Sequence, residues 1–208
     1  MVRQRPSLSN RRKLALSAAL LLLAVGMSAL GAYATFTGSA SVSHTVSSGT
    51  VTIALGATGA STNRLNVNAT NIAPGDTIER SVDLSNTGSL DLSSVTLTTA
   101  ASPSSLLDSD GSNGLQMVID RCASAWTESG TSPAFTYSCS GGAVSVVASR
   151  AVIGSNMSLP GLSALTTGGT DHLRVTLTLP AATGNTFQGL SSTISYTFTG
   201  TQRAATNK

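Results

Sequence analysis

The sequence predicts an all-β protein, an antiparallel two-sheet sandwich of about eight or nine strands after an N-terminal signal helix. Apolar residues recur at every second position over much of the chain, which is the period of a strand with one buried face. Clusters of Gly, Pro, Asn and Asp separate these stretches, as turns do. The chain shows neither a long amphipathic helix after the leader nor alternating strands and helices, so a parallel α/β fold is not expected.

The N-terminus has the organisation of a signal peptide. Basic residues at 11–13 precede an apolar run at 14–30, and Ala32 and Ala34 place small residues where a signal peptidase cuts. We therefore expect cleavage after Ala34, with Thr35 as the first residue of the mature chain. The alternative is a membrane anchor, although the run is close to the lower limit of about 17 residues for a spanning helix.

Cleavage at this point would leave residues 35–208 as a single secreted domain. The chain has 12 basic and 9 acidic residues, but five of the basic residues lie in the leader and all the acidic ones follow it. The mature chain thus has seven basic residues against nine acidic ones, a formal charge of −2. This composition does not indicate nucleic-acid binding, and contact with a membrane is expected only through an uncleaved leader.

The clearest local pattern begins at the Pro-Gly-Asp turn of residues 74–76, where Pro fixes φ, Gly permits positive φ and Asp can bond its own backbone. Apolar and polar residues then alternate over 78–84, and Arg80 is the one exception on the apolar side. A second turn at 86–89 leads to another alternating strand at 92–97. We expect these two strands to form a hairpin-type unit.

The remaining strands are assigned by the same alternation. Their expected ranges are 50–55, 64–70, 115–119, 134–139, 143–148, 173–179 and 194–198. We expect 134–139 and 143–148 to pair as a hairpin through the two glycines at 141–142. Residues 101–113 are expected to be a loop, and 154–169 a long connection whose leucines cover the core.

Several of these motifs resemble the signature of the camelysin/TasA family. In chain order they are Gly31-Ala32-Tyr33-Ala34-Thr35-Phe36-Thr37, Ser48-Gly49-Thr50-Val51, Asn71 with Pro74-Gly75-Asp76, Leu84 with Asn86-Thr87-Gly88-Ser89-Leu90, and Ile194-Ser195-Tyr196-Thr197-Phe198-Thr199 with Gly200-Thr201-Gln202. The resemblance implies a secreted bacterial protein with a jelly-roll-like sandwich, whose leader is removed by a dedicated signal peptidase. Several family members are fibre-forming components of biofilm matrix, so the resemblance also implies self-assembly, with other matrix components as further partners.

Cys122 and Cys139 are the two cysteines of the chain. An even number of cysteines in an exported protein favours a disulfide. The bond would close a loop of about 18 residues, for which the chain-entropy description gives roughly 3 kcal/mol of stabilisation. A metal site is not expected from two cysteines without a nearby histidine.

No catalytic residue and no cofactor are expected. One family member is described as a metalloprotease, so zinc has to be considered, but His44 and His172 are the two histidines and no His-Glu-x-x-His helix is present. Zinc hydrolysis would need both histidines to meet one carboxylate, and Asp171 is expected on the opposite face of its strand from His172. Asp108 and Asp110 have some likeness to a calcium loop, but without EF-hand spacing a solvated turn is the expected structure.

We expect a structural protein rather than an enzyme. Cleavage would free the segment 35–48, which begins at Thr35 and carries Phe36, Val42 and Val46 as sparse apolar residues. This segment is expected either to form a first strand of the domain or to be a loosely held arm. As an arm it would add as a strand to the next subunit, a head-to-tail contact that makes open filaments. Lysine, which normally protects exposed sheet edges, is almost absent from the mature chain.

Two alternatives stand beside fibre formation. A monomeric adhesive module would bind a polysaccharide or a protein through the loops at 108–114 or 124–133, the second of which contains Trp126. A secreted metalloprotease would bind zinc and lose its cleavage activity to a chelator.

Overall fold

The computed structural model describes residues 10, 15, 17, 18 and 46–207. The chain divides into two units, residues 1–46 and 47–208, and the second unit carries the β-rich fold. Most of the predicted leader lies outside the described residues, as do these individual predictions: Ala32, Ala34, Thr35, Phe36, Val42 and His44. Among the described residues, no helix is both long and apolar enough to cross a membrane.

Between residues 53 and 202 the chain forms ten strands and three short helical turns. The strands are β1 (Ile53–Leu55), β2 (Thr77–Asn86), β3 (Leu92–Ala101), β4 (Gln116–Cys122), β5 (Thr127–Thr131), β6 (Ala134–Ser138), β7 (Val144–Ala151), β8 (Gly154–Ser158), β9 (Thr170–Thr178) and β10 (Ile194–Gln202). The helical turns are α2 (Leu106–Ser109), η1 (Ser163–Leu165) and η2 (Asn185–Phe187). The predicted all-β fold is therefore confirmed.

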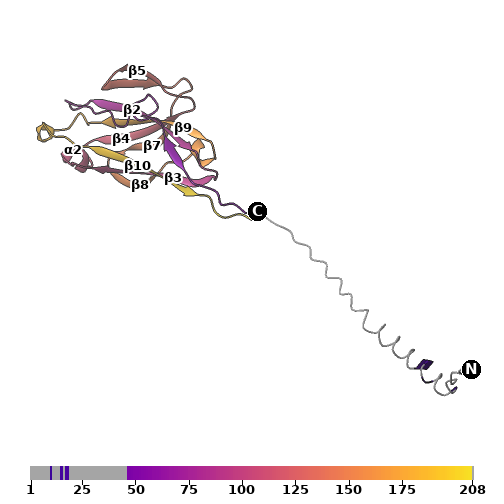
Figure 1. Ribbon diagram of the computed structural model, residues 1–208. Coiled ribbons are helices and arrows are strands. Elements are labelled where there is room, and N and C mark those ends of the chain that lie inside the picture. The colour runs from indigo at the N-terminus through magenta and orange to yellow at the C-terminus, as the bar shows by residue number, and fades with distance from the viewer. Residues whose placement is uncertain (1–9, 11–14, 16, 19–45, 208) are drawn as a thin grey trace, which may run out of the picture. The chain divides into compact units, whose positions relative to one another are not determined.

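The strands form two open antiparallel sheets and a separate hairpin. The larger sheet has the order β1-β2-β9-β4-β7, the smaller has the order β10-β3-β8, and β5 pairs with β6 alone. Figure 1 shows three layers, with the β5–β6 hairpin on one outer side, the five-stranded sheet in the middle and the three-stranded sheet on the other side.

Eight of the strands pair in a nested series. β5 pairs with β6, β4 with β7, β3 with β8 and β2 with β9, each pair antiparallel. This long folded ribbon is rolled up so that β4 also lies beside β9, which is the jelly-roll topology. β1 and β10 each extend one sheet, by pairing with β2 and β3. The prediction of a jelly-roll-like sandwich is confirmed.

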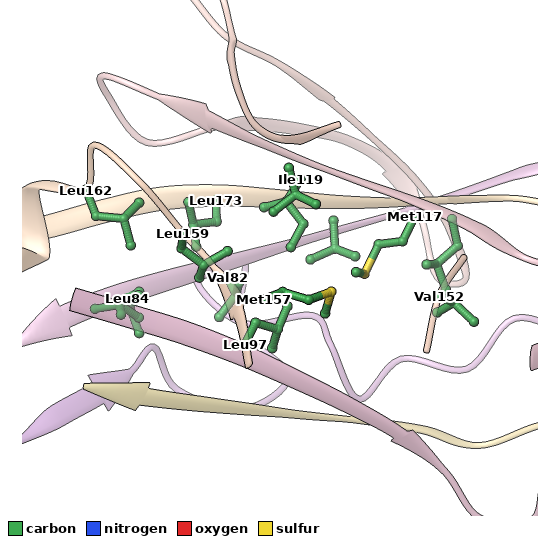
Figure 2. Packing of buried hydrophobic residues seen from close by; sticks show 14 of the residues in the cluster. Val82, Leu84, Leu97, Met117, Ile119, Val152, Met157, Leu159, Leu162 and Leu173 are labelled. Carbon is green, nitrogen blue, oxygen red and sulfur yellow. The ribbon is translucent and has the colours of Figure 1, made fainter. Parts of the chain in front are cut away.

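The core lies between the two sheets. Inward positions of the larger sheet contribute Val82, Ile119 and Leu173, and inward positions of the smaller sheet contribute Leu97 and Met157. Figure 2 shows these side chains packed against one another between the ribbons. The first four are fully buried and Met157 is 5% exposed. Period-two alternation places these residues on one face of each strand, so the same pattern that predicted the strands also builds the core.

The prediction that the strands at 78–84 and 92–97 form a hairpin-type unit is wrong. β2 lies in the larger sheet and β3 in the smaller one, so the connection between them crosses the sandwich. Within this connection, the N–H groups of Ser89 and Leu90 donate to the carbonyl of Thr50 instead of closing a hairpin. Alternation shows that each strand has one apolar face. It does not show whether two such strands lie in the same sheet or in opposite sheets of the sandwich.

Three other local expectations also need correction. Residues 134–139 do not pair with 143–148, because β6 pairs with β5 and β7 pairs with β4. Residues 64–70 form one turn and irregular chain rather than a strand, and the connection at 154–169 contains the strand β8. Its leucines do cover the core, since Leu159 and Leu162 are 1% and 5% exposed.

Candidate functional site

The outer face of the five-stranded sheet carries a cluster of charged side chains centred on Arg174 of β9. Its guanidinium lies 3.0 Å from Oε1 of Glu79 on β2 and 2.8 Å from Oδ2 of Asp120 on β4. The ring of Trp126 lies over the same guanidinium, with 4.7 Å between Cζ and the ring centroid, and its indole N–H donates to the carbonyl of His172. Arg174 therefore ties two strands to the segment that leads into the hairpin. Trp126 is half-buried by these contacts rather than presented as an exposed platform for a sugar.

The β5–β6 hairpin is bound to this face by further polar contacts. The backbone N–H of Tyr137 on β6 donates to Glu79 on β2, and within the hairpin the Tyr137 hydroxyl donates to Oε2 of Glu128 on β5 at 2.8 Å. Arg64 pairs with Glu128 at 2.6 Å and stacks over the ring of Phe135. The hydrogen bond from Arg64 lowers the pKa of the Glu128 carboxyl, and the same bond raises the pKa of Arg64. We call these contacts, by which Arg174, Glu79, Asp120, Arg64 and Glu128 connect the five-stranded sheet, the segment at 64–70 and the hairpin, the charged layer.

Cys122 and Cys139 are joined by a disulfide with a Cα–Cα distance of 5.7 Å, which confirms the predicted bond. Cys122 ends β4 and Cys139 follows β6, so the bond ties the base of the hairpin to the sheet beneath it. It therefore reinforces the charged layer rather than the core between the sheets.

Arg80, the exception in the β2 alternation, faces the inner side and is 5% exposed. Its guanidinium donates to the carbonyls of Val67 and Glu79 at 2.9 and 2.7 Å. Burial lowers the pKa of Arg80. The side chain thus supplies hydrogen bonds to the irregular segment at 64–70, and this role explains a charged residue on an apolar face.

The predicted metal candidate His172 is paired on the outer face, where its Nδ1 lies 2.7 Å from Oδ1 of Asp83. Asp171 is 2% exposed and accepts the backbone N–H groups of Ser163 and Ala164, at 2.9 and 2.7 Å. It fixes the helical turn η1 against β9. Asp171 and His172 thus act on different elements and do not form a common ligand set.

A zinc site does not fit the donors that the structure describes. Within residues 46–207, no three His, Cys, Asp or Glu side chains come together in an arrangement that could hold a metal ion. The carboxylates of Glu79 and Asp120 are held by Arg174, and that of Asp83 by His172. His44, the other histidine, lies outside the described residues.

The calcium candidates Asp108 and Asp110 are both used by local structure. Asp108 is the third residue of a capping box with Ser105 at the start of α2, and it also accepts the hydroxyl of Ser192 at 2.5 Å. Burial alone would raise the pKa of Asp108, but these hydrogen bonds outweigh burial and hold that pKa below its ordinary value. Asp110 accepts the N–H groups of Asn113 and Ser112, which lower its pKa. The expected loop thus contains a capped helical turn, and Asp108 is buried rather than solvated.

β10 forms one edge of the smaller sheet. This strand is nine residues long and contains neither a charged residue nor proline, and among the described residues it pairs with β3 alone. The other sheet edges are less suited to pairing, because β1 has three residues, β8 has five, and β7 contains Arg150. The inward residues Tyr196 and Phe198 of β10 are half-buried beside the fully buried core of β3.

The described chain enters the domain at Thr50, next to the C-terminal end of β10. Thr50 is held by Ser89 and Leu90, and the N–H of Arg203 donates to the carbonyl of Asp91 in the same connection. A Cβ atom on Gly88 would lie 2.5 Å from the Thr50 carbonyl oxygen, so only glycine permits this close approach. Residues 46–50 have no regular structure, and Val46, the described member of the predicted assembly residues, is 81% exposed.

The residues of the charged layer were not singled out from the sequence. Glu79, Asp120 and Arg174 each occupy an outward position of a strand, and the two acidic side chains are opposite in charge to the basic one. This pattern could indicate ion pairs between the strands. It becomes informative only once β9 is known to lie between β2 and β4.

The family model described as Camelysin metallo-endopeptidase matches residues 9–119, just over half of the 208 residues. The match includes the signature turns and β1 to β3, and it ends within β4. The disulfide, the hairpin and β10 all lie beyond it. Comparison with curated proteins gives no match.

Proposed function

The chain belongs to the camelysin metallo-endopeptidase family, and from this premise we propose that it is a secreted structural protein of the cell surface or biofilm matrix. Its subunits join into fibres when the N-terminal arm, residues 35–48, adds as a strand to the next subunit. The observation that supports this proposal most directly is the uncharged edge of β10, which has no second neighbouring strand within residues 46–207. An unpaired edge offers a row of backbone donors and acceptors, and strand addition satisfies them.

The arm is long enough to cover this edge. Fourteen residues in extended form span at most roughly 46–50 Å. The nine residues of β10 span about 30 Å. About five residues therefore remain to connect the paired part of the arm to Thr50, where the domain begins.

The position of the arm favours pairing with another subunit. The arm leaves beside Asp91 and Arg203, at the C-terminal end of β10. If it folded back along β10 of its own subunit, both strands would run in the same direction, whereas every ladder in residues 53–202 is antiparallel. An antiparallel fit within one subunit would use most of the arm as a connector. Pairing with the β10 edge of a neighbouring subunit requires neither a parallel strand direction nor a long connector.

The test compares the chain 35–208 with a variant that lacks 35–48; residues from Ser47 onward belong to one compact unit. We expect the first to grow into uniform filaments in negative-stain images and the second to stay monomeric by light scattering. A synthetic 35–48 peptide should block growth of the longer chain, while a scrambled peptide of the same composition should not. Filament formation by the deletion variant would make the mechanism wrong.

Hydrogen exchange then identifies the acceptor edge. In filaments, backbone amides of β10 should become protected, whereas those of β7, the edge of the other sheet, should not change. Protection of β7 instead of β10 would contradict the assignment of the acceptor.

The family description supports a second candidate, a secreted metalloprotease. Its test is the zinc content of the purified chain, together with cleavage of a denatured protein before and after chelation. Stoichiometric zinc that is lost in a His44→Ala variant, with chelator-sensitive cleavage, would favour the protease over the fibre subunit.

A further inference from the structure

The outer face of the three-stranded sheet is a continuous array of hydroxyl groups without any charge. We propose that this face is a lateral contact between two copies of the chain, through which fibres pair side by side. The proposal rests on the proposed function and adds a second contact to it. We call this surface the hydroxyl face, and it consists of Ser94, Thr96, Thr98, Ser158, Thr197, Thr199 and Thr201.

Strand alternation and register define the array. Val95 and Leu97 of β3 are buried in the core, so Thr96, which lies between them, points outward. Directly across from it lie Ser158 on β8 and Thr199 on β10. The next outward row pairs Thr98 with Thr197, and a third pairs Ser94 with Thr201. Rows of hydroxyls therefore repeat at about 7 Å along the strands and about 5 Å across them.

The chemistry of this face suits a second copy of itself. A hydroxyl group both donates and accepts a hydrogen bond, so an array of hydroxyls is complementary to an identical array. Among the described residues, the hydroxyls of Thr96, Thr197 and Thr199 have no hydrogen-bond partner. Their methyl groups add apolar surface that an isologous contact would bury.

Charge argues against other occupants. β3, β8 and β10 contain no Asp, Glu, Lys or Arg, so two such faces meet without repulsion. The charged groups near the face lie at its rim, where Arg150 borders Gly154 and Arg203 follows β10. Polyanions and acidic surfaces find no cation on the face itself. The aromatic residues Tyr196 and Phe198 point into the core, so no ring is available to stack on a sugar.

The test places two lysines on the face, away from the β10 edge, in a Thr96→Lys, Ser158→Lys variant. Because the two positions face each other across β3 and β8, pairing would bring four new positive charges together. The matched control is Ser129→Lys, Thr136→Lys, a directly opposed Ser/Thr pair on the β5–β6 hairpin. Thermal unfolding of both variants checks that the fold is retained.

In low salt, we expect single filaments from the Thr96→Lys, Ser158→Lys variant, with the fraction of filaments in bundles at least about tenfold below that of the parent chain. Filament length should be unchanged, bundling should return as added salt screens the charges, and the control should bundle like the parent. Equal bundling of both variants would overturn the proposal.

If the parent chain forms no filaments, the proposed function fails, and sedimentation of the same three proteins then decides the lateral contact. A concentration-dependent dimer of the parent and the control, but not of the Thr96→Lys, Ser158→Lys variant, would support it. Monomers in all three would overturn it.

Discussion

The two outer surfaces of this sandwich are built from strands of similar length but have opposite chemistry. Outward positions of β2, β4 and β9 carry Glu79, Asp120 and Arg174, and the β5–β6 hairpin covers these charges. Outward positions of β3, β8 and β10 carry Ser and Thr, and no other element of the described chain packs over them. In this fold, charge on the outside of a sheet therefore marks the side that the chain itself covers.

The difference follows from how each surface is stabilised. Ion pairs of the charged layer are 15–21% exposed at their side chains, so each is screened less than a fully exposed pair. They act together with the disulfide and the Trp126 contact to hold a hairpin that has little core of its own. The hydroxyl face needs no such reinforcement, because its strands are fixed by the core on their other side.

The largest expected effect is loss of the disulfide. A Cys122→Ser, Cys139→Ser variant should lose roughly 3 kcal/mol of unfolding free energy, because the bond no longer restricts the unfolded chain. Hydrogen exchange should rise mainly in β5 and β6 and much less in β3 and β10. A uniform increase in exchange over both surfaces would show that the tether is not specific to the charged layer.

Arg174→Met should have the next largest effect. The substitution leaves Glu79 and Asp120 without their shared cation and removes the partner of the Trp126 ring, so we expect a loss of about 2 kcal/mol by chemical denaturation. Arg150→Met on the exposed part of β7 is the matched control and should change stability by less than about 0.5 kcal/mol. Equal effects of both substitutions would mean that the cluster does not act as a unit.

Acid should weaken the charged layer. The hydrogen bond from Arg64 lowers the pKa of Glu128 below its ordinary value of 4.5, so the folded chain binds this proton less readily than the unfolded chain does. The resulting stability is fully present above about pH 4.5 and is lost as the pH falls through the folded-state pKa. We expect this loss to be small, because solvent screens the pair. Denaturation between pH 7 and pH 3 should show a weaker acid dependence for Glu128→Gln than for the parent chain.

The smallest effect is expected on the other surface. Thr199→Val removes an exposed hydroxyl without a partner in the described chain and keeps the branched shape, so stability should change by less than about 0.5 kcal/mol. Thermal unfolding measures this directly. A loss above about 1 kcal/mol would show that the hydroxyl face takes part in the stability of the subunit itself.

Features that depend on residues close together in the sequence, or on residue counts, could be predicted. Alternation located β2, β4, β9 and β10 within a few residues, and the number of cysteines predicted the bond between Cys122 and Cys139. The strand β5 was missed because Thr-Glu-Ser-Gly-Thr has no apolar alternation, and it is held by contacts to other elements instead.

Features that depend on which strands become neighbours could not be predicted. Glu79 and Arg174 are 95 residues apart, and their pairing requires β9 to lie beside β2. The same holds for Arg80, whose position in the alternation was recognised but whose carbonyl partners belong to a separate segment. Sequence spacing alone does not contain these contacts.

Nested pairing also sets the order in which the chain can fold. Two residues connect β5 and β6, whereas 83 residues separate β2 from β9. Loop-closure entropy increases with separation, so we expect the innermost pair to form first and the β2–β9 pair to close the fold last. A chain that ends before Thr170 lacks the strand between β2 and β4, and its circular dichroism should be that of an unfolded polypeptide. The edge of β10 is then presented only by a subunit synthesised to completion, which would keep unfinished copies out of a growing polymer.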